Sequence, residues 1–366
     1  MATPTGPVHH LMKATPACGF SADTEILTRH QGWVTLDQLT CLDEVATRSP
    51  DGRFEWQHPE RITWERYDGE MVRFHGRSMD LMVTPDHPVL WSPDPRTPER
   101  RSPASVILAR SAGLTRLRTS AYFSPTSTWD APDLPEKVFH GARRTKMGPK
   151  PRDIRMTGDQ FAAFMGMYIA EGSATPTPND WLIAISQSVS GKGYEEYRAL
   201  LTEVTGHEPG RSPGAWVLHS RALYEYLRPL GKARNKRLPD EALNLSRRQL
   251  EILWRYYFLG DGSYERRVNR ATEGIAAATA SPVLAGQLQE VIQKIGWCSS
   301  VRKYQYKPTS LVPRSGPIFK LRIRKTASPG CGVTSVCYAG MTGSVEVPNG
   351  VVYVRRDGHP AWCAGA

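Results

Sequence analysis

The most constraining feature of the sequence is an apolar segment that occurs twice and ends each time in an acidic residue. Residues 164–173 read FMGMYIAEGS, and residues 255–263 read RYYFLGDGS. In each copy a small residue precedes the acid and Gly-Ser follows it, so Glu171 and Asp261 occupy matching places. A single acid after an apolar helix is more often an ordinary helix end, whereas the duplication predicts a paired structure.

A helix start precedes each acid at nearly the same distance. Thr157-Gly-Asp-Gln160 and Ser246-Arg-Arg-Gln249 both have the capping-box pattern, in which the first and fourth residues satisfy each other's backbone donors. Apolar residues at helical spacing follow each start. We therefore expect two helices of about 20 Å, at ~1.5 Å per residue, that pack along their apolar faces around a pseudo-twofold axis.

Such packing would bring Glu171 and Asp261 together at one end of the helix pair. Two carboxylates that lie close together repel each other unless protons or cations neutralise them. Carboxylate oxygens suit Mg²⁺ or Mn²⁺, and Mg²⁺ also binds phosphates. A divalent cation between two carboxylates beside a basic surface can hydrolyse a phosphodiester. The sequence thus predicts Mg²⁺ or Mn²⁺ bound between Glu171 and Asp261.

The charge of the chain favours a polyanionic partner. The 366 residues include 47 Lys and Arg against 36 Asp and Glu, a net charge of +11. Nucleic acid fits such an excess better than a membrane does in a chain without lipid anchors. The alternative is a basic protein that binds no polyanion.

The composition indicates a cytoplasmic protein in a bacterium or a phage-infected cell. The six cysteines show no CxxC pairing with metal spacing, which favours a reducing compartment. No stretch approaches the roughly 20 apolar residues of a membrane span. Residues 1–17 also lack the apolar core of a signal peptide.

The texture of the chain changes twice, which predicts an α+β insert inside an all-β unit. Short strand patterns fill residues 20–125, with a hairpin turn at Gly76-Arg77-Ser78, and similar patterns return after residue 334. Between them, longer helical periods alternate with strands, after a Pro-rich basic stretch that reads as a linker. We expect four parts: a tail at 1–17, a first β part at 18–140, the insert at 141–329 and a second β part at 330–366.

The central part resembles the LAGLIDADG homing endonucleases. FMGMYIAEGSA and YYFLGDGSYE stand at the two family motifs, and NKRLPDEAL at 235–243 resembles the segment between the repeats. The resemblance implies an α+β domain with pseudo-twofold αββαββα repeats, in which Glu171 and Asp261 bind the metal and Lys236 lies near the scissile phosphates. One departure is Tyr256, where a small residue is usual; Gly166 occupies that place in the first motif.

DNA contacts are expected from the strands that follow each acid-ended helix. Polar and basic residues occupy these strands, although a solvated surface is the alternative reading of any single arginine. The candidates are Arg143, Arg144, Lys192, Arg266, Arg267, Arg270 and Arg302.

The flanks resemble the splicing domain of inteins, the all-β, horseshoe-like Hint fold. GFSADTEILTRHQGWVTLDQL resembles its first block, VTPDHPVLW its Thr-x-x-His block, and GSVEVPNGVVYVRRDGHPAWCAGA its last two blocks. A nucleophile that attacks its own preceding carbonyl begins splicing. The resemblance implies that His87, with Thr84, strains and protonates that scissile amide as a general acid.

Two positions that splicing requires differ from the intein pattern. The first nucleophile falls on Gly19, with Cys18 adjacent, and the terminal Asn is replaced in Cys363-Ala364-Gly365-Ala366. A penultimate His is also missing. Ser344 stands where an Asp or an internal Cys is found, and Trp91 fits the subclass with the internal nucleophile. Since Gly and Ala cannot attack or cyclise, we expect impaired splicing, through decay, truncation or engineering.

These patterns predict an intein-type protein, monomeric, that cuts double-stranded DNA at a long site and carries host exteins in cis. Two alternatives remain open. The central domain could be a DNA-binding module with decayed catalysis, or the chain could be a splicing element with an inert endonuclease.

Overall fold

The computed structural model describes residues 18–76, 79–94, 96–112, 121–123, 126–141, 153–177, 180–265, 274–305, 316–325 and 330–365. The predicted tail at 1–17, the turn at 77–78 and most of the basic linker lie outside these residues. Six predicted site residues also lie outside them: Arg143, Arg144, Arg266, Arg267, Arg270 and Ala366.

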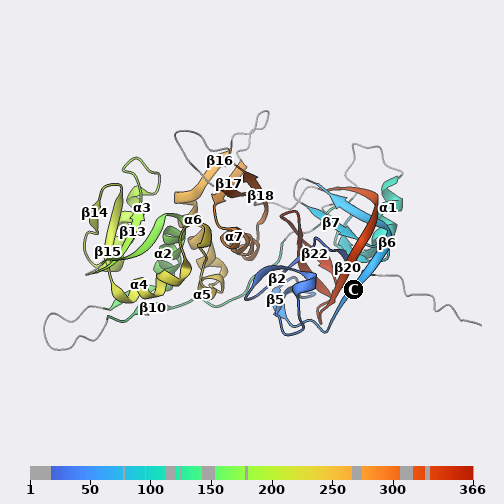
Figure 1. Ribbon diagram of the computed structural model, residues 1–366, viewed down its shortest axis with the longest axis horizontal. Coiled ribbons are helices and arrows are strands. Elements are labelled where there is room, and N and C mark those ends of the chain that lie inside the picture. The colour runs from blue at the N-terminus through green and yellow to red at the C-terminus, as the bar shows by residue number, and fades with distance from the viewer. Residues whose placement is uncertain are drawn as a thin grey trace, which may run out of the picture.

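Strands from both ends of the chain form one β body, seen on the right of Figure 1. Its first part contains β1 Phe20–Ser21, β2 Glu25–Thr28, β3 Gly32–Thr35, η1 Leu36–Gln38, β4 Val45–Arg48, β5 Phe54–Gln57, β6 Arg61–His75, β7 Asp80–Val83, β8 Pro88–Trp91, β9 Arg100–Pro103 and α1 Ala104–Ala112. Its last part contains β20 Gly332–Glu346, β21 Val351–Arg356 and β22 His359–Ala364.

Pairing between distant strands closes the β body. β6 and β20 pair along their whole length, from Arg61 opposite Glu346 to His75 opposite Gly332. They form a closed barrel with β1 and β7, while β22, β21, β2, β4 and β5 form a second sheet to which β3 is added. The chain thus leaves this body and returns to it after about the length of a domain, as an insert requires.

The central body contains two repeats of the order helix, strand, strand, helix, strand, strand. The first repeat comprises α2 Gly158–Glu171, β12 Gly172–Thr177, β13 Asp180–Ser186, α3 Tyr194–Thr205, β14 Gly210–Ser212 and β15 Ala215–His219, followed by α4 Arg221–Leu227. The second comprises α6 Arg247–Asp261, β16 Gly262–Glu265, β17 Gly274–Thr279, α7 Pro282–Lys294, β18 Cys298–Gln305 and β19 Pro317–Arg324. The sheets run β12-β13-β15-β14 and β16-β17-β19-β18, the same order in each repeat.

Short elements precede and join the repeats. They are β10 Glu136–Phe139, β11 Ile154–Thr157, η2 Arg228–Leu230, η3 Ala233–Asn235 and α5 Asp240–Leu243. β10 pairs with β11, which leads directly into α2, so this strand belongs with the central body. Among the described residues, no helix combines the length and the apolar character that a membrane crossing requires.

The two predicted helix starts differ in one detail. At α2 both bonds of the capping box form between Thr157 and Gln160. At α6 the Ser246 side chain accepts from the Gln249 backbone N–H, but the Gln249 side chain instead bonds both backbone groups of Leu134. The second box is therefore half formed, because its glutamine anchors the segment that leads into the central body.

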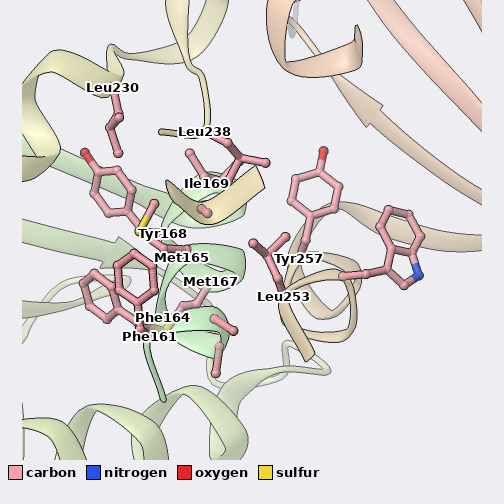
Figure 2. Packing of buried hydrophobic residues seen from close by; sticks show 14 of the residues in the cluster. Phe161, Phe164, Met165, Met167, Tyr168, Ile169, Leu230, Leu238, Leu253 and Tyr257 are labelled. Atoms are coloured by element: carbon pink, nitrogen blue, oxygen red, sulfur yellow. The ribbon is translucent and has the colours of Figure 1, made fainter. Parts of the chain in front are cut away.

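Helices α2 and α6 pack closely, despite Tyr256. A Cβ built on Gly166 would lie 2.2 Å from the backbone oxygen of Leu253 and 3.0 Å from the Tyr256 Cβ. Figure 2 shows residues of α2, among them Phe164 and Met165, in the core beside Leu253 and Tyr257 of α6. Gly166 alone therefore allows the close approach that the sequence predicts for both motifs.

Helix α7 joins the central body to the β body. Its Lys294 is fully buried, bonds Glu290 on the same helix and lies 4.1 Å from the centre of the Trp129 ring. One turn of side chains also reaches the β body, where the hydroxyl of Tyr353 donates to the Gln293 Oε1 at 2.9 Å. These buried polar contacts hold the two bodies in a fixed relation.

Candidate functional sites

The two predicted carboxylates end matching helices. Glu171 is the last residue of α2 and Asp261 the last of α6. A Cβ built on Gly260 would lie 2.7 Å from the Ala170 Cβ and 2.9 Å from the Glu171 Cγ. The absence of a side chain at Gly260 therefore lets Glu171 lie against α6 directly beside Asp261.

The glycine after each acid is required by the turn of the chain. A Cβ on Gly172 would meet the Tyr168 ring at 2.2 Å, and one on Gly262 would meet the Phe258 ring at 2.1 Å. Each glycine leaves its helix in extended conformation, so a strand starts at once. The repeated acid-Gly pair thus places a carboxylate at the point where a helix becomes a strand.

Two lysines bind the carbonyl groups of these glycines. Lys236, 7% exposed, donates to the Gly172 oxygen at 2.7 Å. Lys192 donates to the Gly262 oxygen and lies 4.9 Å from the centre of the Phe258 ring. The structure thus brings Lys236 to the carboxylates, and it brings Lys192, predicted as a DNA contact, to the same place.

The carboxylates share a site from which water is largely excluded. Burial, then the charge of Glu171, raise the pKa of Asp261 to about 7, against the opposing charge of Lys236. Burial also raises the pKa of Glu171, and it lowers the pKa of Lys236 to about 8. Negative charge in such a site is costly until a cation neutralises it.

The donor set fits a hard divalent cation. Glu171 and Asp261 supply carboxylate oxygens, the ligands that Mg²⁺ prefers. Nowhere in the described part of the chain do three or more His, Cys, Asp or Glu side chains gather as a metal-binding cluster. A cation held here would therefore keep coordination places for water or phosphate.

The sheet of the second repeat has one basic face. Val301 and Leu321 are paired and buried toward α7, so their neighbours Arg302 and Lys320, also paired, lie on the opposite face. Arg322 lies on that face as well, opposite Ser300. Lys320 and Arg322 share Glu265 as an ion-pair partner. Arg302 was predicted from the sequence and the other two were missed, although the alternation in FKLRIR signals a strand with one basic face.

A second site gathers the two ends of the β body. Gly19 donates from its backbone N–H to the Thr84 Oγ1 at 3.0 Å, and the Thr84 N–H donates to the Gly19 oxygen at 2.9 Å. The Cys18 Sγ lies 3.4 Å from the Nδ1 of His87. The structure therefore brings four predicted residues of the amino-terminal block together.

The carboxyl end meets the same histidine. The Nε2 of His87 lies 3.0 Å from the Ala364 oxygen and 3.6 Å from the Cys363 Sγ. Because that carbonyl only accepts, Nε2 carries the hydrogen and Nδ1 accepts from the thiol of Cys18. Complete burial lowers the pKa of His87 to about 3 and raises that of Cys363, so both are neutral near pH 7.

Two other predicted positions lie beside this cluster rather than in it. Ser344 is buried and exchanges a hydrogen bond of 2.7 Å with Thr63. Its neighbour Gly343 pairs with Phe20, so Ser344 is one residue from the amino-terminal strand. Trp91 is buried with the guanidinium of Arg100 4.4 Å from the centre of its ring.

A family comparison identifies the central body. The family model of the LAGLIDADG-like domain matches residues 249–324, which run from α6 to the end of β19. The chain carries a LAGLIDADG-like domain. The match covers the second repeat and confirms the resemblance predicted from the two acid-ended helices.

Relatives of this LAGLIDADG-containing chain have unrelated names. The proteolytic subunit of an ATP-dependent Clp protease of Chlamydomonas moewusii is 26% identical over 272 residues, covering 69% of this chain and 25% of its own. The catalogue of relatives also includes an A-type ATP synthase polypeptide of Pyrococcus abyssi, 24% identical over 302 residues and covering 77% of this chain and 29% of its own. The chain therefore spans only about a quarter to a third of the length of these relatives.

Solved structures give loose superpositions. The AceL NrdHF class 3 split intein, a splice-inactive variant, covers 95% of this chain and 98% of its own at 7% identity and a TM-score of 0.31. Variants of the homing endonuclease I-DmoI cover 45% and 89%, at 9% identity and 0.33. I-WcaI bound to its DNA recognition sequence covers 45% and 75%, at 13% identity and 0.27. The family assignment rests on the repeat and the family match instead.

Proposed function

We propose that the chain is an intein-type protein whose LAGLIDADG domain cuts double-stranded DNA at one long site, with Mg²⁺ or Mn²⁺ as its cofactor. The observation that carries this proposal is the approach of Glu171 to Asp261 across the helix pair, made possible by Gly260. The two relatives with unrelated names support an element inserted in different hosts, since the matches cover only 25% and 29% of those proteins.

The residues of the site have separate tasks. Glu171 and Asp261 would hold the cation, which when bound activates water and stabilises the leaving oxygen. Lys236 and Lys192 fix the glycine carbonyls beside the carboxylates and keep positive charge near the position of a phosphate. The basic face of β18 and β19 would hold the DNA backbone, mainly through phosphate contacts.

A cleavage assay tests the endonuclease. The purified chain is incubated with a library of DNA fragments of uninterrupted host genes, with and without Mg²⁺, and the ends of any cut fragment are sequenced. We expect one cut site, and we expect Glu171→Gln or Asp261→Asn to abolish cutting while DNA binding remains. Glu251→Gln, an exposed change on α6, serves as the control. Normal cutting by both carboxylate variants would refute the metal site, and binding without any cleavage would favour a decayed module.

We further propose that the β body is a splicing domain whose self-splicing is impaired. The supporting observation is that Cys18 and Gly19 at one end, and Ala364 at the other, all meet at His87 and Thr84. Exteins in cis would be its partners, and the monomer would suffice for both activities.

Restoring the missing side chains tests splicing. Gly19→Cys and Ala366→Asn are introduced together in a chain with flanking sequences, and the products are weighed by mass spectrometry. A Cβ at position 19 would lie 3.0 Å from the Gly343 oxygen, so a small shift accommodates it. Released or ligated flanks are expected. The absence of both products would leave the endonuclease as the sole activity.

A further inference from the structure

Arg101 binds the backbone at the carboxyl end of the β body. Its Nη2 donates to the Gly365 oxygen at 3.0 Å. Arg101 lies on β9, opposite Leu90 of β8, and His87 directly precedes β8. One hairpin therefore carries His87 to the carbonyl of Ala364 and Arg101 to the carbonyl of the next residue.

Gly365 can be held only through its backbone. A Cβ at this position would lie 2.5 Å from the Val345 oxygen, so the close packing excludes a side chain. Its N–H donates to the Gly350 oxygen at 2.9 Å, which leaves the carbonyl as its other polar group. Arg101 satisfies that carbonyl. The terminal peptide is thus fixed on one side by a backbone group and on the other by a guanidinium.

The charge of Arg101 also reaches the thiol and imidazole groups of the site. Burial raises the pKa of Cys18, and the positive charge of Arg101 opposes that rise, while Asp86 and Glu346 add to it. His87 faces the same thiol at Nδ1. The guanidinium is therefore close enough to act on both ends of the chain that meet there.

We propose that Arg101 is a positioning residue of the splicing site, where it holds the Gly365–Ala366 peptide group beside His87 and orients the terminal scissile segment. This inference rests on the proposed splicing function. With Asn at position 366, the side-chain nitrogen attacks the backbone carbonyl carbon of the same residue. The C–N bond to the following residue breaks, and a succinimide forms. The attacking nitrogen loses one proton and the leaving amine gains one.

The first test uses the chain as it exists. Alkylation of Cys18 by iodoacetamide is followed between pH 7 and pH 10 by peptide mass spectrometry, which separates this thiol from the exposed Cys41 and Cys337. Arg101→Met is expected to raise the pKa of Cys18 and so slow alkylation at each pH, and Arg101→Lys to change it less. The control is Arg100→Met, the neighbouring arginine on Trp91. Identical profiles for Arg101→Met and the control would overturn the inference.

The second test compares the two cleavage steps in the Gly19→Cys, Ala366→Asn chain. Arg101→Met is expected to slow cleavage after position 366 by about ten- to hundredfold, as misplacement of a reacting group does, and to leave thiol-induced cleavage before position 19 nearly unchanged. Equal loss of both steps, or of neither, would overturn the positioning role alone. If the parent with Arg101 intact performs neither cleavage, the proposed splicing function fails and the inference fails with it.

Discussion

Replacement of Asp261 by Asn should stabilise the protein while it removes the endonuclease. In the folded state the pKa of Asp261 is raised from 3.8 to about 7, first by burial and then by Glu171. The folded state therefore binds a proton that the unfolded chain has released between about pH 4 and pH 7. Stability falls as the pH rises through that window, and the full cost of the ionised carboxylate is present above it.

The magnitude follows from the size of the shift. A difference of about 3 pKa units at about 1.36 kcal/mol each corresponds to about 4 kcal/mol when Asp261 is ionised. The amide of Asn has a similar shape and no charge, but it loses the hydrogen bond with Tyr257 that favours the carboxylate. We expect the free energy of unfolding of Asp261→Asn at pH 8 to exceed that of the unchanged chain by about 2–4 kcal/mol.

Urea titrations in EDTA between pH 4 and pH 8 measure this difference. The gain should be near zero at pH 4 and largest above pH 7. Glu251→Gln on the exposed side of the same helix should change stability by less than about 0.5 kcal/mol at every pH. A variant that is no more stable than the unchanged chain at pH 8, or a gain independent of pH, would refute the argument that the two carboxylates share a desolvated site.

The same variant also tests the cation. At pH 8, Mg²⁺ should stabilise the unchanged chain in proportion to RT ln(1 + [Mg²⁺]/Kd), because the ion binds the folded state. Asp261→Asn should lose this stabilisation. An equal response of both proteins to Mg²⁺ would place the ion elsewhere.

Three further changes test other parts of the molecule. Lys294→Met leaves Glu290 buried without its partner, so the free energy of unfolding should fall by about 3–5 kcal/mol and partly recover in the double variant with Glu290→Gln; equal values for both would contradict a net cost of the unpaired charge. Gly166→Ala forces α2 and α6 apart and should cost about 1–3 kcal/mol by urea titration, together with the stabilisation by Mg²⁺; retention of both would show that the helices can separate without effect. Arg302→Gln with Arg322→Gln should lower the slope of log K against log salt for duplex DNA by about 2 in fluorescence anisotropy, while an unchanged slope would exclude phosphate contacts by this face.

The helices and their carboxylates could be predicted because their signals are local. Thr157 and Ser246 begin helices at which the side chain caps its own segment, and helical spacing continues to each acid. The identity of the last residue in each helix follows from the glycine after it. The strands β13 and β19 were equally visible as apolar runs, since one face of each is buried.

The remaining features depend on contacts between distant parts of the chain. The pairing of β6 with β20 joins strands separated by the whole central body, and no turn signal connects them. Gln249 bonds Leu134 instead of completing its cap, which only the folded chain brings within reach. Lys192 contacts Gly262 because the loop before α3 turns toward the second repeat. Arg101 lies in a Pro- and Arg-rich stretch that reads as a solvated loop until β9 pairs with β8.

The two sites differ in which atoms define their geometry, and this explains how splicing chemistry can be lost while the fold persists. Thr84 holds Gly19 through the backbone N–H and carbonyl of that residue, and Arg101 holds Gly365 through its carbonyl. Neither contact requires the side chain of a nucleophile or of an asparagine, so substitutions at positions 19 and 366 leave the arrangement around His87 in place. The central site has no such reserve, because its functional groups are the carboxylates themselves. Helix α7 still docks on the β body through buried polar contacts, so the endonuclease keeps a structural need for the splicing domain after splicing has ceased.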